Sequence, residues 1–111
     1  MDYLPVDVGI HFESDYVTLL TTNIMKKYSK LNLLFIGGTL IVDIAIPAKE
    51  IITIAVLDKP LCQHGVFNKN DHFVPMLWWI DSNGSLNIYA ENEVPKGTYI
   101  YFSDFYVCNP F

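Results

Sequence analysis

The sequence predicts an all-β domain, an antiparallel β-sandwich of jelly-roll-like type. Short segments in which apolar and polar residues alternate recur along the chain, and turn-forming residues separate them. After Lys30, no run of ten or more residues carries a helical pattern. The 111 residues suit one domain, and 51% apolar against 17% charged residues can build a core. We therefore expect a single sandwich over residues 1–111, with its core strands in residues 31–108.

The N-terminal segment, residues 1–30, fits two interpretations. Apolar residues lie there at helical spacing: Val17, Leu20, Ile24 and Tyr28. The same stretch contains "YVTLLTT", which is rich in the β-branched and aromatic residues that strands prefer. Because the rest of the chain is β, we favour strands here.

Two alternating runs follow this segment. In "LNLLFIGGTLIVDIAIP" the apolar face is Leu40, Val42, Ile44 and Ile46, and in "IITIAVLDKP" it is Ile52, Ile54 and Val56. The pair Gly37-Gly38 predicts a bulge or a tight bend between two strand segments. Pro60 ends the second run because proline cannot donate to a strand ladder. The polar loop "CQHGVFNKNDHFVP" comes next, and Val66-Phe67 is a candidate for a short edge strand within it.

The stretch "MLWWIDSNGSLNIYA" is a predicted hairpin with two competing registers. A two-residue Asn-Gly turn would place Asp81 on the same face as the core residues. A three-residue loop with Gly84 in the left-handed conformation instead gives one wholly apolar face: Met76, Trp78, Ile80, Leu86, Ile88 and Ala90. Burying an unpaired carboxylate is costly, so we expect the second register. Trp78 then lies in the core and Trp79 on the opposite face.

Two strands therefore present aromatic and polar side chains away from the main core. Trp79 lies beside Asn87 and Tyr89, and the last strand carries Tyr99 and Tyr101 on one side. A subunit contact, an internal second layer or direct ligand contact would each account for these faces, and we favour the subunit contact.

Composition excludes several classes of function. Seven basic against twelve acidic residues give a net charge of −5, and "MKKYSK" is the only cationic cluster, so nucleic-acid binding is not expected. The apolar stretches are too short and too interrupted to span a bilayer, and no signal peptide pattern opens the chain. We expect a protein made in a cytoplasm, with Cys62 and Cys108 as free, buried thiols.

The order of these segments resembles a known family. "YSKLNLLFIGGTLIVDIAIP", "IITIAVLDKP", "FVPMLWW", "SNGSLNIYA" and "VPKGTYIYFSDFYV" follow one another as in the C-terminal head domains of tail-fibre, baseplate and receptor-binding proteins of tailed phages and prophages of Gram-positive bacteria. The resemblance covers roughly Tyr28 to Val107. Two motifs depart from the pattern: "LDKPL" has Asp58 where the family has a proline, and the "K-x-G-N" turn reads "KLN".

The resemblance implies a non-enzymatic component of a virion tail, present in the host cytoplasm during assembly. Such heads form trimers, contact other tail proteins and bind host-surface saccharides; a structural adaptor without sugar affinity is the alternative. The residue types agree, since an aromatic ring stacks on a sugar face while carboxylates and amides bind its hydroxyls. The candidate residues for ligand binding or subunit contact are Trp79, Asp81, Asn87, Tyr89, Tyr99, Tyr101 and Asp104.

No motif predicts catalysis, a metal or a cofactor. Cys62, His64, Asp71 and His72 could in principle ligate a metal, but a lone Cys-x-His without a second tight ligand pair is a weak pattern. We expect His64 and His72 to face solvent. No Cys-His nucleophilic pair or spaced pair of carboxylates marks a hydrolase, so we expect no enzyme, no metal site and no cofactor.

Overall fold

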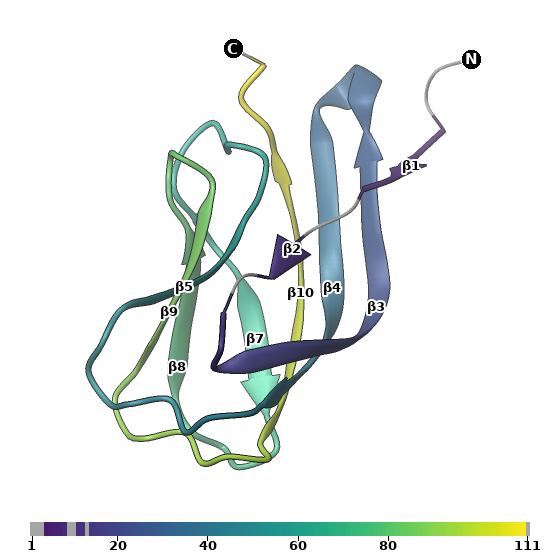
Figure 1. Ribbon diagram of the computed structural model, residues 1–111. Helices are drawn as coiled ribbons and strands as arrows, with labels where there is room; N and C mark the ends of the chain where they lie inside the picture. Colours follow the sequence, from purple (N-terminus) through teal and green to yellow (C-terminus); the bar gives the residue numbers. More distant parts are fainter. Residues whose placement is uncertain (1–3, 9–10, 13, 111) are drawn as a thin grey trace.

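The computed structural model describes residues 4–8, 11–12 and 14–110, and it confirms the antiparallel β-sandwich (Figure 1). The described residues form the strands β1 (Val6–Asp7), β2 (His11–Phe12), β3 (Val17–Tyr28), β4 (Leu33–Val42), β5 (Ile52–Val56), β6 (His64–Gly65), β7 (Phe67–Asn70), β8 (Met76–Ile80), β9 (Ser85–Ala90) and β10 (Tyr99–Val107). One turn of 3-10 helix, Ser29–Leu31, joins β3 to β4.

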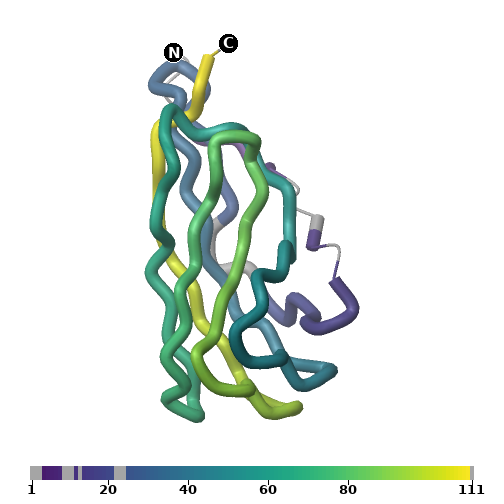
Figure 2. The backbone as a smooth tube through the Cα atoms, turned by 90° about the vertical axis from the view of Figure 1, so that its left-hand side faces the viewer, coloured from purple at the N-terminus to yellow at the C-terminus, as the bar shows by residue number. Residues whose placement is uncertain are grey.

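The strands form two five-stranded sheets. The first sheet has the order β1-β3-β4-β10-β7 and the second the order β2-β5-β9-β8-β6. The chain crosses between the sheets four times after β4, as in jelly rolls. The molecule is elongated, 46 × 25 × 21 Å, and Figure 2 shows the strands running along its length. The β3–β4 and β8–β9 turns lie at one end, and the loops after β4, β7 and β9 lie at the other (Figure 1).

The N-terminal segment forms strands, so the helical interpretation of residues 17–28 is wrong. β3 pairs with β4 over their whole lengths, with register shifts between Leu19 and Thr21 and between Thr22 and Ile24. β4 continues without a bend through Gly37-Gly38, so the irregularity lies in its partner strand. A Cβ at Gly38 would come 2.4 Å from the Thr21 carbonyl oxygen, so glycine is what lets β3 and β4 approach here.

The core lies between the two sheets. From the first sheet come Leu34, Ile36, Leu40, Val42, Ile100, Phe102 and Tyr106; from the second come Ile54, Ala55, Trp78, Ile80, Leu86, Ile88 and Ala90. Across the interior, Trp78 stacks on Phe102 with ring centroids 5.3 Å apart. The predicted apolar face of the hairpin is thereby confirmed as part of the core.

Two predicted core residues are exposed instead. Ile44 is 52% exposed because β4 ends at Val42: the amides of Asp43 and Ile44 both donate to the Tyr16 carbonyl. Val56 is 61% exposed because β5 contains a bulge, which reverses the alternation after Thr53.

The loop predicted between β5 and β8 contains two short strands. β7 is the edge strand of the first sheet, near the predicted edge strand at residues 66–67, and β6 is the edge strand of the second. Cys108 is a buried free thiol, but Cys62 is exposed, so the prediction that Cys62 is buried was wrong. Among the described residues, no helix has the length and apolar character needed to cross a membrane.

Candidate functional site

The β8–β9 hairpin positions the first group of predicted site residues. Its register pairs Ile80 with Leu86 and Trp78 with Ile88, as expected for the three-residue loop. Gly84 has φ +92°, and its amide donates to the Asp81 carbonyl at 3.0 Å. This local geometry selects the register that separates the two tryptophans.

Trp78 and Trp79 have different environments, as predicted. Trp78 is 3% exposed, and its Nε1 is buried without a hydrogen-bond partner among the described residues. Trp79 is half-buried on the outer face of the second sheet, where it pairs with Asn87. Beside that pair, Leu77 pairs with Tyr89. The outer face of the hairpin is therefore an apolar and aromatic platform.

The polar residues predicted on this platform hydrogen-bond within the protein. Asn87 is only 5% exposed; its Nδ2 donates to Asp81 Oδ2 at 3.0 Å and its Oδ1 accepts from Thr53 Oγ1 at 2.6 Å. Asp81 Oδ1 accepts from the amides of Asn83 (3.2 Å) and Ser85 (3.1 Å). These contacts hold the hairpin loop and link it to β5. Asp81 retains about one of the four acceptor positions of a carboxylate.

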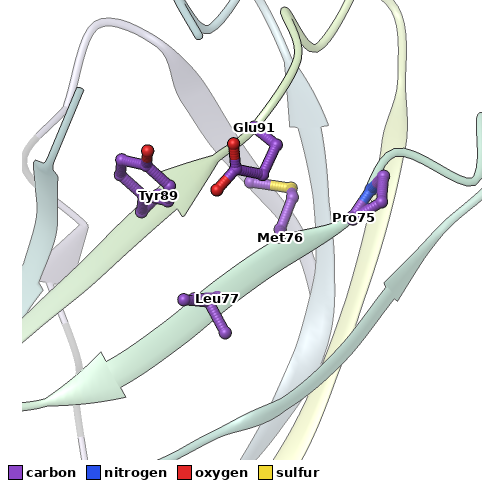
Figure 3. Close-up of a pocket in the computed structure, with 5 residues that line it drawn as sticks. All are labelled: Pro75, Met76, Leu77, Tyr89 and Glu91. Atoms are coloured by element: carbon purple, nitrogen blue, oxygen red, sulfur yellow. The ribbon is translucent and has the colours of Figure 1, made fainter. Parts of the chain in front are cut away.

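A pocket of about 260 Å³ opens at the other end of the platform (Figure 3). It is lined by Pro75, Met76, Leu77, Tyr89 and Glu91. Glu91 directly follows β9 and is exposed, and in the described part of the chain no hydrogen bond or ion pair engages its carboxylate. Sequence reasoning missed Glu91, although strand alternation places it on the face of Tyr89, two residues beyond.

A second pocket, of about 320 Å³, adjoins the first and shares Pro75 and Met76 with it. At its rim, Phe73 is 90% exposed and has a positive φ of 54°. The side chain of Asn70 supports this turn: its Oδ1 accepts from the amides of His72 and Val74, and its Nδ2 donates to the Val74 carbonyl. This turn lies in the segment predicted to be a polar loop, because nothing local in the sequence distinguishes an exposed Phe73 from a buried one.

Tyr99 and Tyr101 lie on the far side of the sandwich from the hairpin platform. Each is 39% exposed, on the outer face of the first sheet. The seven predicted residues therefore do not form one site. Trp79 and Tyr89 form the platform, with Asp81 and Asn87 supporting it, while the two tyrosines belong to another surface.

Asp104 belongs to neither outer face. On β10 it alternates with Tyr101 and Ser103, so its side chain points toward the second sheet, where Oδ1 lies 2.9 Å from His64 Nε2. Its Oδ2 accepts from the Phe67 amide at 3.0 Å. Burial alone would raise the pKa of this carboxyl, but the hydrogen bonds from His64, Phe67 and Phe105 outweigh burial and lower it below the ordinary 3.8. Asp104 joins the edges of the two sheets.

The residues weighed as metal ligands are separated in space. His64 pairs with Asp104, while His72 Nδ1 lies 2.9 Å from the carboxylate of Asp71, on the turn after β7. Within the described ranges, no group of three or more His, Cys, Asp or Glu side chains is placed to hold a metal ion. The prediction that His64 faces solvent was wrong in part, since the Asp104 contact half-buries it.

Comparison with protein-family models, curated proteins and solved structures finds no match to this chain.

Proposed function

We propose that this chain is a non-enzymatic head domain of a phage or prophage tail, which assembles as a trimer and binds host-surface saccharide on the hairpin platform. The order of strand motifs, through its resemblance to such heads, supports the tail assignment. One observation carries the binding role: the Trp79–Tyr89 platform ends in a pocket that presents the exposed carboxylate of Glu91.

The chemistry of this platform suits a sugar. The rings of Trp79 and Tyr89 offer apolar surface to the C–H face of a pyranose, and the Glu91 carboxylate accepts hydrogen bonds from its hydroxyls. Asp81 and Asn87 hold the hairpin rigid, so the platform is organised before the ligand arrives. This assigns them a supporting role in place of the ligand contact expected from sequence.

A purely structural role as a tail adaptor is the second candidate. Leu77 is 65% exposed in the middle of the platform, and an aliphatic side chain in that position suits contact with another protein better than contact with a sugar. The two candidates differ in whether a free saccharide binds.

Binding of the wild-type chain to a glycan array and to purified cell-wall polysaccharide tests the proposal. We expect Tyr89→Ala to weaken binding about tenfold or more, and Glu91→Gln to weaken it by a similar factor, because a hydrogen bond to a charged group contributes about 1.5–3 kcal/mol. Glu93→Gln, which removes an exposed carboxylate two residues further on, is the matched control and should bind as the wild type does.

Circular dichroism establishes that each variant is folded. A folded wild-type protein that binds no saccharide in either assay would favour the adaptor. Equal losses in Glu91→Gln and Glu93→Gln would mean that the site lies elsewhere.

A further inference from the structure

We propose that copies of this chain associate through the outer face of the first sheet, formed by β4, β10 and β7. The outward residues of these strands are Leu33, Phe35, Thr39, Ile41, Tyr99, Tyr101, Ser103, Phe105, Val107, Phe67 and Lys69. This inference rests on the oligomer in the proposed function and names the surface that forms it. It does not depend on saccharide binding.

The face exposes several aromatic side chains on neighbouring strands. Phe67 is 64% exposed, Phe105 is 55%, Val107 is 43%, and Tyr99 and Tyr101 are 39% each. At about 200 Å² for a whole aromatic side chain, the four rings expose on the order of 400 Å², and Val107 adds to this apolar area; the total lies within the range of the largest apolar patch of a typical monomer. The half-buried outward residues of β4 extend the patch toward the roughly 800 Å² that each partner contributes to a standard interface.

The rings on this face are already ordered. Phe35 and Phe105 stack with centroids 5.1 Å apart, and Tyr28 meets the edge of Phe35 at 5.5 Å. Rings fixed in this way lose little side-chain entropy on association. Tyrosine and phenylalanine are also the residue types enriched at the centres of protein interfaces.

The distribution of charge identifies a second copy of this chain as the occupant. The chain has twelve acidic residues and a net charge of −5, yet no outward position on β4, β10 or β7 carries a carboxylate. β10 has one acidic residue, Asp104, and its side chain is turned toward His64. Two copies of an acidic chain repel each other wherever carboxylates meet, and this face avoids that repulsion.

Polar groups lie at the rim. Lys69 places its ammonium 5.9 Å from the Tyr101 ring centre, and Lys26 pairs with Asp7 at 2.9 Å beside Phe35. At the other end, the Asp71 carboxylate accepts from the Tyr99 amide at 3.0 Å. A basic partner would need free carboxylates here and a nucleic acid would need more cations, so neither fits as well as a second copy.

Sedimentation analysis across a range of concentrations tests this assignment. We expect the wild type to be an oligomer, and Phe105→Glu or Tyr101→Glu to raise its dissociation constant by at least about a hundredfold, because each puts a carboxylate where copies meet. Val56→Glu makes a comparable change on the exposed face of the second sheet, outside the binding platform, and should leave the mass unchanged. Thermal unfolding of each variant shows whether it is folded. Because two variants alter the face, the test still works if one of them fails to fold.

The outcomes separate the two proposals. A wild type that is monomeric at every concentration overturns the oligomer of the proposed function and this inference together. A wild-type oligomer that survives the Phe105 and Tyr101 substitutions, or that Val56→Glu dissociates equally, overturns the choice of face alone.

Discussion

Replacing Gly84 by alanine should destabilise the protein much more than the same change at Gly97. Both glycines have a left-handed backbone, with φ +92° and +87°. They differ in their surroundings: a Cβ at Gly84 would come 2.3 Å from the carbonyl oxygen of Leu57, while a Cβ at Gly97 would have no atom within 4 Å. The pair therefore separates the cost of φ from the cost of the clash.

The magnitude follows from the contacts. In both variants, holding alanine in a left-handed conformation destabilises the folded state by about 1–2 kcal/mol. In both, the lower conformational entropy of the unfolded chain offsets about 0.4–1 kcal/mol of this loss. At Gly84 the backbone must also move away from β5. That movement weakens the hydrogen bond from the Leu57 amide to the Gly84 carbonyl (2.8 Å), which is worth about 1 kcal/mol. It also strains the packing around Leu57, at about 1–3 kcal/mol. We expect Gly84→Ala to lose about 2–4 kcal/mol more than Gly97→Ala.

Urea unfolding followed by tryptophan fluorescence measures this difference, because Trp78 is buried and Trp79 half-buried on the hairpin that Gly84 closes. Equal slopes against urea would establish that the comparison is between stabilities. If the two alanine variants unfold at the same urea concentration, the close approach of the hairpin loop to β5 does not exist in solution.

Three further predictions concern the core, the strand pairing and the sheet edge. Trp78→Ala should cost about 3–5 kcal/mol of stability, whereas Trp79→Ala should leave the fold intact and weaken saccharide binding; equal loss of fold in both would contradict the register. Gly38→Ala should destabilise the protein by about 1–3 kcal/mol, because the new Cβ would meet the backbone of Thr21. Gly65→Ala is the control: a Cβ there meets no atom within 4 Å, so thermal unfolding should show little change in stability. The pKa of Asp104 in the folded protein lies below 3.8, so the contribution of this carboxylate to stability is present above the ordinary carboxyl pKa and is lost as the pH falls below it. Asp104→Asn should therefore lower the unfolding free energy by about 1–3 kcal/mol at neutral pH and by less at strongly acidic pH. A difference in urea unfolding that does not change with pH would refute this.

The hairpin could be predicted from sequence because local residues determine it. Gly84 supplies the left-handed position, and Asp81 excludes the competing register by the cost of burying a carboxylate. Once the register was correct, alternation assigned Trp78 to the core and Trp79 to the outer face. The same rule extended by one step would have added Glu91 to the candidate residues.

The β5 strand shows where such reasoning ends. Its sequence alternates regularly, yet a bulge opposite β9 buries Ala55 and exposes Val56. A single unpaired residue reverses the faces and leaves no mark in the composition. Similarly, Ile44 looked like a continuation of β4, but its amide binds Tyr16, which is distant in sequence.

The candidate site was only partly predictable for a related reason. Alternation along one strand shows which of its residues share a face. It does not show which faces of two different strands lie on the same surface of the sandwich. Tyr89 and Tyr101 therefore looked equivalent, although they lie on opposite surfaces of the sandwich. The pairing of Asp104 with His64 depends on two edge strands from different sheets, and no local pattern brings them together.

The edge strands restrict how this protein can assemble. β1, β2 and β6 have two residues each, and β7 has four. Edge strands this short offer few free amides and carbonyls of their own for strand-by-strand addition of further chains, a route that leads to open-ended fibres. Contact through sheet faces does not require free strand edges, and a symmetric arrangement of such contacts closes on itself. The brevity of these strands therefore favours assemblies with a defined number of subunits over fibres that grow without limit.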